Sequence, residues 1–218
     1  MLKQVALIGS APTWRDAPFH EEDEAWQIWA HASCQPLHPS RVDRWFDLHT
    51  VETWRQGKTW YRPWSNEPAT YVEWLATRIV PVMMQAHYPI VPASQAYPLQ
   101  EIVEAFEIVP KTWNLTPGHP DWWRAVKDRG EFTSTVSYMI ALALFQGVEE
   151  LALYGIDFIG QDPAGIERSY QRAGAKYWVG VARGMGVPVT VARGSWFEQA
   201  PWLYGYQPTP TRPQEVLV

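Results

Sequence analysis

The chain has 218 residues, 46% hydrophobic and 19% charged, so it has enough apolar side chains for a sizeable core and does not belong to the disordered class. Its net charge of −5 and its pI near 5.7 argue against non-specific binding of nucleic acid, which needs a basic surface. Because no apolar run approaches the ~20 residues that span a bilayer, and because the lone Cys34 has no partner for an internal disulfide, we expect one cytoplasmic domain over residues 1–218.

Short apolar segments that end at turn residues predict buried strands along the chain. The first covers residues 5–8 and ends at Gly9. Further strands are expected at residues 27–30, 45–48, 81–85, 107–109, 151–154 and 187–191.

Helices are predicted between these strands. The clearest begins at residues 133–135, because apolar residues then recur at helical spacing as far as Leu144 and Gly147 can end the helix. A second helix is expected over residues 169–185. Strands that alternate with helices favour an α/β fold, specifically a Rossmann-like three-layer sandwich with a mostly parallel central sheet. A less regular segment (about 50–130) is expected to cover the site, and a Pro-rich tail follows at 207–218.

The turn after the first strand is the first candidate binding element. Small residues there let backbone N–H groups and hydroxyls approach a phosphate or a ribose. The segment has neither the three spaced glycines of dinucleotide-binding proteins nor the lysine of a P-loop, so a plain turn is an equal alternative. Its residues are Gly9, Ser10, Ala11, Pro12 and Thr13.

The start of the helix near residue 133 is the second candidate binding element. Thr133, Ser134 and Thr135 supply three hydroxyls at the positive end of a helix dipole, an arrangement that suits an anion. The alternative is ordinary N-capping, which needs only one of these hydroxyls.

His49 is the first candidate for a general base. It lies two residues after Asp47 in an extended segment, so the two side chains project to the same side. Asp47 would then fix the tautomer of the imidazole if the two groups meet. The alternative is a histidine with a structural role.

Acidic and basic groups after the strand at 151–154 add further candidates. Asp157 follows the strand directly, where it can orient substrate or base, or cap a turn. Glu167 is a third candidate catalytic acid or base, and Tyr170 and Arg172 are candidate ligands of the nucleotide. A solvated start of a helix is the alternative for this segment. Neither metal-ligand spacing nor a Gly-x-Ser-x-Gly motif is present, so we expect no structural metal and no cofactor beyond the substrate donor.

Three segments together resemble a known group of enzymes. They are the strand and Gly-Ser-Ala-Pro turn at 5–12, the Thr-Ser-Thr helix start at 133–146, and the Gly-Ile-Asp strand end within 147–158. They are similar to bacterial sialyltransferases that use CMP-sialic acid and to archaeal-type hydroxymethylpterin pyrophosphokinases. The resemblance implies that the turn and the helix start contact the nucleotide. The sialyltransferases carry a catalytic histidine after the Gly-Ile-Asp strand, whereas this chain has no histidine after His119.

Most of the chain also resembles a family of uncharacterised bacteriophage proteins, through Arg-Trp-Phe-Asp-Leu-His (44–49), Tyr-Gln-Arg (170–172) and Leu-Tyr-Gly-Tyr (203–206). The resemblances imply a nucleotide-binding transferase, a glycosyltransferase-like enzyme that uses a nucleotide-activated sugar, in the host cytoplasm if phage-encoded. The alternatives are pyrophosphokinase-like phosphoryl transfer and a non-catalytic protein that binds or sequesters a nucleotide.

Partners are predicted less directly. A modified base in nucleic acid is one conceivable acceptor, although the acidic charge disfavours it. A Trp-rich segment (Trp54, Trp60, Trp64, Trp74) that one domain cannot easily bury, together with the resemblance, favours a homodimer. No membrane partner is expected.

Overall fold

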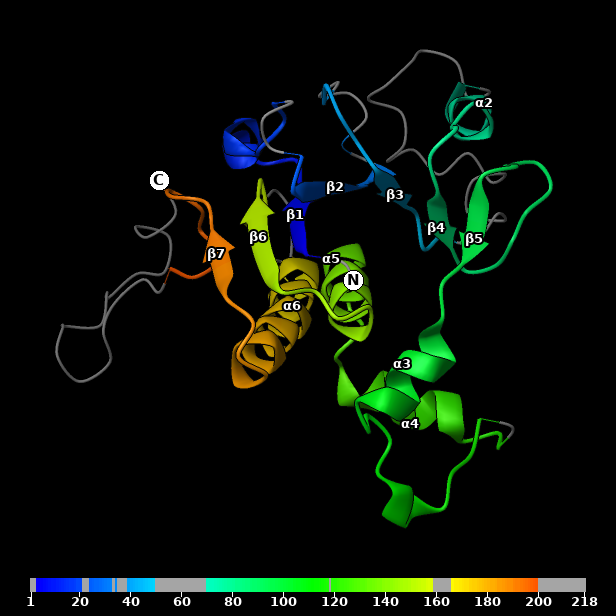
Figure 1. The fold of residues 1–218 in the computed structure, drawn as a ribbon. Helices are drawn as coiled ribbons and strands as arrows, with labels where there is room; N and C mark the ends of the chain where they lie inside the picture. The colour runs from blue at the N-terminus through cyan, green and yellow to red at the C-terminus, as the bar shows by residue number, and fades with distance from the viewer. Residues whose placement is uncertain are drawn as a thin grey trace, which may run out of the picture.

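The computed structural model describes residues 3–20, 24–32, 34, 39–49, 70–117, 119–158 and 166–199, with the backbone alone described at 70 and 166–168. Within these ranges seven strands form one parallel sheet in the order β5-β4-β3-β2-β1-β6-β7 (Figure 1). The strands are β1 (Gln4–Ile8), β2 (Trp26–His31), β3 (Arg44–Phe46), β4 (Val82–Met84), β5 (Ser94–Ala96), β6 (Glu150–Tyr154) and β7 (Val189–Val191).

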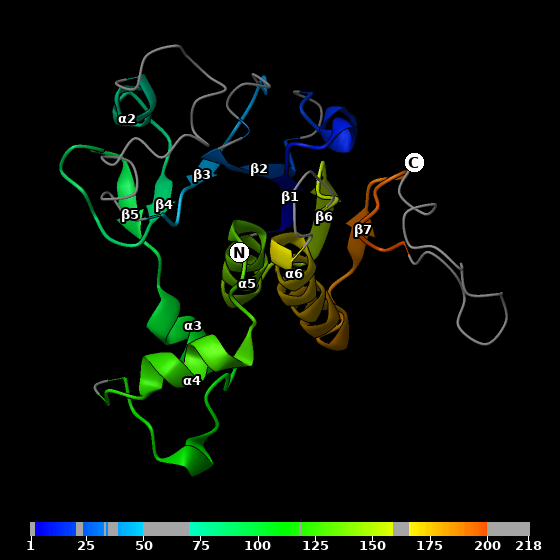
Figure 2. The same ribbon diagram turned by 180° about the vertical axis from the view of Figure 1, so that it is seen from behind.

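Alternate residues of the strands bury two separate cores, one on each face of the sheet. Leu7 belongs to the core beneath α3 (Leu99–Ala105), α4 (Trp122–Arg129), α5 (Thr135–Phe145) and α6 (Ile166–Gly184). Ile8, the next residue, belongs to the core beneath α2 (Thr70–Ala76), near the short helix η1 (Pro12–Asp16). Figures 1 and 2 show these helices on opposite sides of the sheet. The predicted Rossmann-like three-layer sandwich is therefore confirmed.

The helix α5 is more deeply buried than its sequence pattern predicts. The spacing of its apolar residues indicates one buried face, yet nearly every residue from Val136 to Leu144 is buried. The cause is its position, because α5 packs against the sheet, α3 and α6 at once. A helix enclosed in this way is apolar all round.

Two strand assignments differ from the prediction. The strand expected at 107–109 is wrong: Glu107 has a φ of +50°, which breaks an extended strand, and Ile108 and Val109 enter the core as part of a loop. The fifth strand in the chain is instead β5, a short edge strand with two exposed residues. Between 70 and 129 the chain also forms α2, α3 and α4, so this part is more regular than expected.

Several sequence features can be placed within this fold. Cys34 is buried, donates its thiol hydrogen to the Ile8 carbonyl, and has its pKa raised by burial. Trp74 packs edge to face on Trp45, with ring centroids 5.0 Å apart. Residues 54, 60 and 64 and the Pro-rich tail lie outside the described residues. Among the helices that the structure describes, none is long and apolar enough to cross a membrane.

Candidate functional site

The turn after β1 lies at the topological switch point of the sheet. The chain runs from β1 through β2 to β5 on one side, and β6 then pairs with β1 on the other side. Ligands of open α/β sheets bind at the carboxyl ends of the strands at such a point. The turn at residues 9–13, which the sequence predicts to bind a ligand, therefore lies where folds of this kind favour one.

Much of this turn is nevertheless engaged by the protein itself. The Gly9 N–H donates to the Tyr154 carbonyl at 2.7 Å, and the Ala11 N–H donates to the Gly155 carbonyl at 2.9 Å. A Cβ atom on Gly9 would lie 2.2 Å from the Gly155 carbonyl oxygen, so close backbone packing already explains the glycine. The Thr13 hydroxyl accepts from the Gly155 N–H at 3.0 Å. Ser10 and Pro12 are the exposed residues of the turn, and their contact with a ligand stays a prediction.

The start of α5 also has internal hydrogen bonds. Ser134 is the N-cap, and its hydroxyl accepts from the Ser137 N–H at 3.2 Å. The Thr133 hydroxyl donates to the Tyr170 carbonyl at 2.8 Å, which ties this loop to α6. Thr135 is the first helical residue. The capping alternative is therefore observed for Ser134, while anion binding by the three hydroxyls stays a prediction, as does a ligand contact of the exposed Tyr170 ring.

Removing the cap should destabilise the protein. Ser134→Ala is expected to lower the free energy of unfolding by about 1 kcal/mol, the usual cost of losing a serine N-cap. Thr135→Ala, one residue further on and outside the cap, is the control and should change stability by less than half as much. Urea denaturation of both variants measures the difference. Equal effects would show that the Ser134 hydroxyl does not stabilise α5.

Asp157 and Arg172 both hold the segment that follows β7. The Asp157 carboxylate accepts from the Trp196 N–H at 3.2 Å. The Arg172 guanidinium donates to the backbone carbonyls of Trp196, Phe197 and Gln199 over 2.6–3.0 Å. A phosphate would have to displace these carbonyls to bind Arg172. The side chain of Glu167 lies outside the described residues, so its catalytic role stays a prediction.

Asp47 and His49 meet at the carboxyl end of β3, as the sequence predicts. The Asp47 N–H continues the strand ladder by donating to the Met83 carbonyl at 2.9 Å. One carboxylate oxygen of Asp47 accepts from the His49 N–H at 3.0 Å and lies 2.8 Å from the imidazole Nδ1. The Asp47 side chain is 1% exposed and that of His49 is 36% exposed, so a buried anion supports a ring that reaches the surface.

Tyr71 of α2 fixes the Asp47 carboxylate from the other side. Its hydroxyl donates to the second carboxylate oxygen, and its ring is buried in the core beneath α2. With both oxygens engaged, Asp47 favours the tautomer that carries its proton on Nδ1 and its lone pair on Nε2. Asp47 also stabilises the imidazolium that forms when Nε2 takes a proton. The arrangement has the chemistry of a general base. Sequence reasoning missed Tyr71, which no local pattern links to Asp47.

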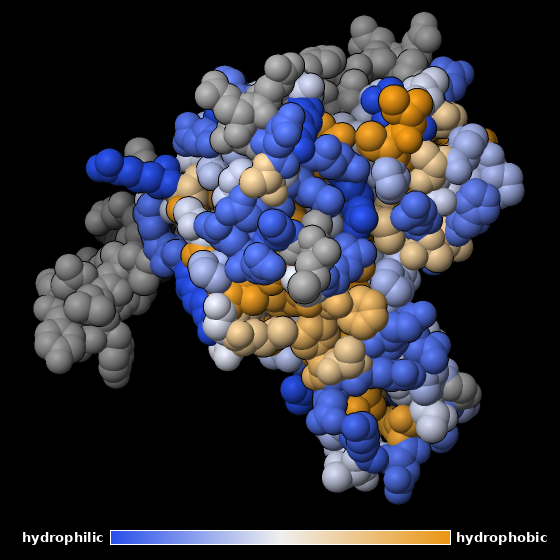
Figure 3. Space-filling view, in the orientation of Figure 1, coloured by the Kyte–Doolittle hydropathy of each residue, from blue (hydrophilic) through white to orange (hydrophobic). Residues whose placement is uncertain are grey.

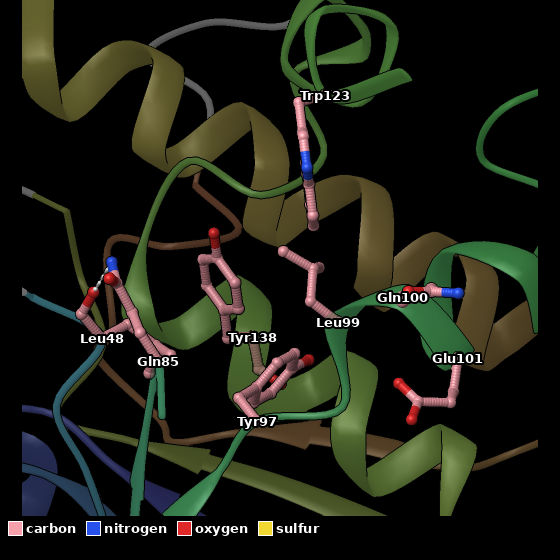
Figure 4. A pocket seen from close by; sticks show the side chains of 8 residues that line it. All are labelled: Leu48, Gln85, Tyr97, Leu99, Gln100, Glu101, Trp123 and Tyr138. Atoms are coloured by element: carbon pink, nitrogen blue, oxygen red, sulfur yellow. Dashed lines mark hydrogen bonds between the residues drawn. The ribbon is translucent and has the colours of Figure 1, made fainter. Parts of the chain in front are cut away.

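A pocket of about 360 Å³ opens at the same edge of the sheet (Figure 4). It lies on the α5 side of β3: Leu48 lines it and packs against the core beneath α5, whereas Asp47, one residue earlier, contacts Tyr71 on the α2 side. Burial raises the pKa of the Tyr97 and Tyr138 phenols there. The eight lining residues are Leu48, Gln85, Tyr97, Leu99, Gln100, Glu101, Trp123 and Tyr138.

The structure thus brings some candidates together and leaves others apart. Neither the turn at 9–13 nor the helix start at 133–135 is part of the lining of this pocket. His49 joins Asp47 and Tyr71, whereas Asp157 and Arg172 gather around residues 195–199. In the part of the chain that the structure describes, no group of three His, Cys, Asp or Glu residues is placed to hold a metal ion.

Comparison with known proteins gives a distant likeness. No family model and no curated protein matches the sequence. Two solved structures of the sialyltransferase CstII from Campylobacter jejuni are similar in fold. The complex with CMP-3FNeuAc is 13% identical over 87% of this chain and 80% of that chain, with a TM-score of 0.46. The complex with cytidine-5'-monophosphate is 14% identical over 89% and 81%, with a TM-score of 0.42. The chain is therefore similar to these structures at the level of the α/β fold alone.

Proposed function

We propose that this chain is a glycosyltransferase-like enzyme in which His49 is the general base. One observation carries the proposal: a half-exposed imidazole whose Nδ1 lies 2.8 Å from a buried carboxylate, at the carboxyl end of a parallel strand. A carboxylate that is buried, and held by Tyr71 besides, fixes the ring in place. Such preorganisation is what proton transfer from a bound group requires.

The reaction that we propose needs one base and one good leaving group. His49 Nε2 takes the proton of an acceptor hydroxyl while that oxygen attacks the anomeric carbon of the activated sugar. The bond from this carbon to the nucleotide phosphate breaks, and the nucleotide leaves as an anion. The resemblance of the segments at 5–12, 133–146 and 147–158 to nucleotide-binding segments supports a nucleotide-activated donor. Ser10 and the first turn of α5 are the proposed contacts of the leaving group.

A non-catalytic nucleotide-binding protein is the second candidate function. One observation favours it: His49, the proposed base, is not among the residues that line the pocket. The pyrophosphokinase alternative needs a carboxylate cluster for Mg²⁺. The described residues provide no such cluster, so the structure adds no support for it.

A thermal-shift screen with CMP, UDP, ADP and their sugar conjugates tests the donor class. A ligand at about 100 times its Kd stabilises the folded state by ~2.7 kcal/mol. We expect one nucleotide and its sugar conjugate to raise the melting temperature, and the others to leave it unchanged. A protein that no nucleotide stabilises at millimolar concentration would contradict the proposal and its second candidate together.

Tyr71 should act as a positioning residue for this chemistry. Tyr71→Phe keeps the ring in the core and removes the hydrogen bond to Asp47. We expect kcat to fall by about two- to tenfold with KM unchanged, and the acidic limb of the pH–rate profile, on which a general base must lose its proton, to move. Tyr88→Phe, which also keeps its ring against this core, is the control. An unchanged pH profile in Tyr71→Phe would remove Tyr71 from the mechanism.

A further inference from the structure

The pocket beside β3 has walls made of three aromatic side chains from three elements. Tyr97 follows β5, Trp123 belongs to α4 and Tyr138 to α5 (Figure 4). Tyr97 and Tyr138 are held edge to face, with centroids 5.0 Å apart, and the Tyr97 hydroxyl donates to the Tyr138 carbonyl at 2.9 Å. Trp123, in contrast, is 52% exposed. The pocket therefore combines fixed rings with one large indole surface that solvent still reaches.

Several polar groups surround these rings. In the described part of the chain, no hydrogen bond engages the Tyr138 hydroxyl, the Trp123 Nε1 or the Glu101 carboxylate. The Gln85 Nε2 donates to the Leu48 carbonyl at 2.8 Å, and this hydrogen bond fixes the position of the Gln85 side chain and of its amide oxygen. The set mixes donors with acceptors. A ligand with several hydroxyl groups matches it, because each hydroxyl both donates and accepts.

The charge of the lining selects against anions. Glu101 is the charged residue among the eight that line the pocket, which include no lysine or arginine. A phosphate or carboxylate brought into this space would face the Glu101 carboxylate with no cation to compensate it. The nucleotide part of a donor is therefore disfavoured here, and so is an acidic sugar.

The position of the pocket relates it to the proposed base. Leu48 lines the pocket and lies between Asp47 and His49 in the sequence, so the pocket opens at the carboxyl end of β3 on the side opposite Asp47, and an acceptor bound there must reach across this end to His49. We infer that this pocket binds the acceptor of the transfer reaction, and that the acceptor is an uncharged, hydroxyl-rich ring such as a hexose residue. This inference rests on the function proposed above. The volume of about 360 Å³ is within the usual range for small-molecule sites.

Binding of simple sugars to the full chain tests this assignment without any turnover. The probes are uncharged methyl hexosides, each paired with the methyl glycuronide that has the same ring and an added carboxylate. By saturation-transfer NMR and calorimetry, we expect at least one hexoside to bind and its glycuronide to bind several-fold more weakly. Glu101→Gln should bring the two affinities together, because it removes the repulsion and keeps the side-chain volume.

Matched aromatic variants locate the bound sugar. Trp123→Ala should weaken hexoside binding by about three- to tenfold, since an aromatic contact contributes on that order. Trp113→Ala is the control, because this tryptophan is 49% exposed and does not line the pocket. Tyr138→Phe, which keeps the ring, should weaken binding by about two- to tenfold through the lost hydroxyl.

Two results would overturn the inference: no hexoside binds at millimolar concentration, or binding survives Trp123→Ala and Tyr138→Phe unchanged. Preference for the glycuronide would also contradict it. These outcomes are separate from the failure of the proposed function. If hexosides bind as expected but no donor is turned over, the pocket stands as a sugar site and the transferase proposal fails. If donor turnover depends on His49 while Trp123→Ala leaves hexoside binding unchanged, the transferase proposal holds and the acceptor binds elsewhere.

Discussion

His49→Asn should lower turnover by roughly 10²–10⁴ while nucleotide affinity stays nearly unchanged. Asparagine keeps part of the volume and hydrogen bonding of histidine and lacks the ring nitrogen that accepts the proton. The loss is expected on kcat because the role that we propose for the imidazole concerns the proton of the acceptor and not the nucleotide. Asp47→Asn should also lower kcat strongly, since it exchanges the buried anion 2.8 Å from Nδ1 for a neutral amide.

A second histidine–aspartate pair provides the control. The His119 Nδ1 and the Asp121 Oδ2 lie 3.9 Å apart and both side chains are exposed, so His119→Asn should leave turnover unchanged. Steady-state kinetics with a titration of nucleotide binding separates the two effects. If turnover survives in His49→Asn and disappears in Asp157→Asn, the base is Asp157. Equal activity of the His49 and His119 variants would contradict the assignment of His49.

Gly9→Ala should lower the free energy of unfolding by roughly 3 kcal/mol or more, at the upper end of what overpacking costs. The new Cβ would lie 2.2 Å from the Gly155 carbonyl oxygen and 2.9 Å from the Ile156 side chain. Gly155 has a φ of +65° and accepts from the Ala11 N–H, so the backbone opposite has little freedom to retreat. The strain falls on the contact between the ends of β1 and β6, which positions the switch point.

Gly180→Ala is the matched control. Gly180 is exposed near the carboxyl end of α6, four residues before the helix ends at Gly184, and an added Cβ there meets no atom within 4 Å. This substitution should raise stability by about 0.5–1 kcal/mol, because alanine restricts the unfolded chain and favours the helix. Urea denaturation monitored by circular dichroism gives both values. A Gly9→Ala protein as stable as the wild type would show that the two turns are not packed as closely as described.

The parts of the fold that were predictable are those whose pattern is local. β1, β6, α5 and α6 have apolar runs or apolar periodicity with clear turn residues behind them, and each was expected close to its observed place. β5 has the sequence Ser-Gln-Ala, and it is a strand only because it pairs with β4 at the edge of the sheet. The segment 107–109 is the reverse of β5: its apolar residues predict a strand, but they are buried by tertiary packing and do not form one.

The candidate site divides in the same way. Asp47 and His49 are two residues apart, so an extended chain alone places them on one side. Tyr71 reaches Asp47 from a helix 24 residues further along, and the pocket draws on residues from 48 to 138, so both depend on the assembled fold. The sequence leaves the glycine of the turn after β1 open between a ligand contact and a plain turn. Its close packing on Gly155 becomes visible only when β1 and β6 are paired.

Release of free nucleotide measures directly whether the chain transfers a sugar from a nucleotide donor, as we propose. The wild-type protein is incubated with CMP-, UDP- and GDP-activated sugars, with and without methyl hexosides, and nucleotide release is followed by chromatography. We expect release from one donor class, faster with an acceptor present and reduced to near background in His49→Asn. A protein that binds a nucleotide tightly but releases none above the buffer rate would contradict the transferase proposal and favour a nucleotide-binding protein.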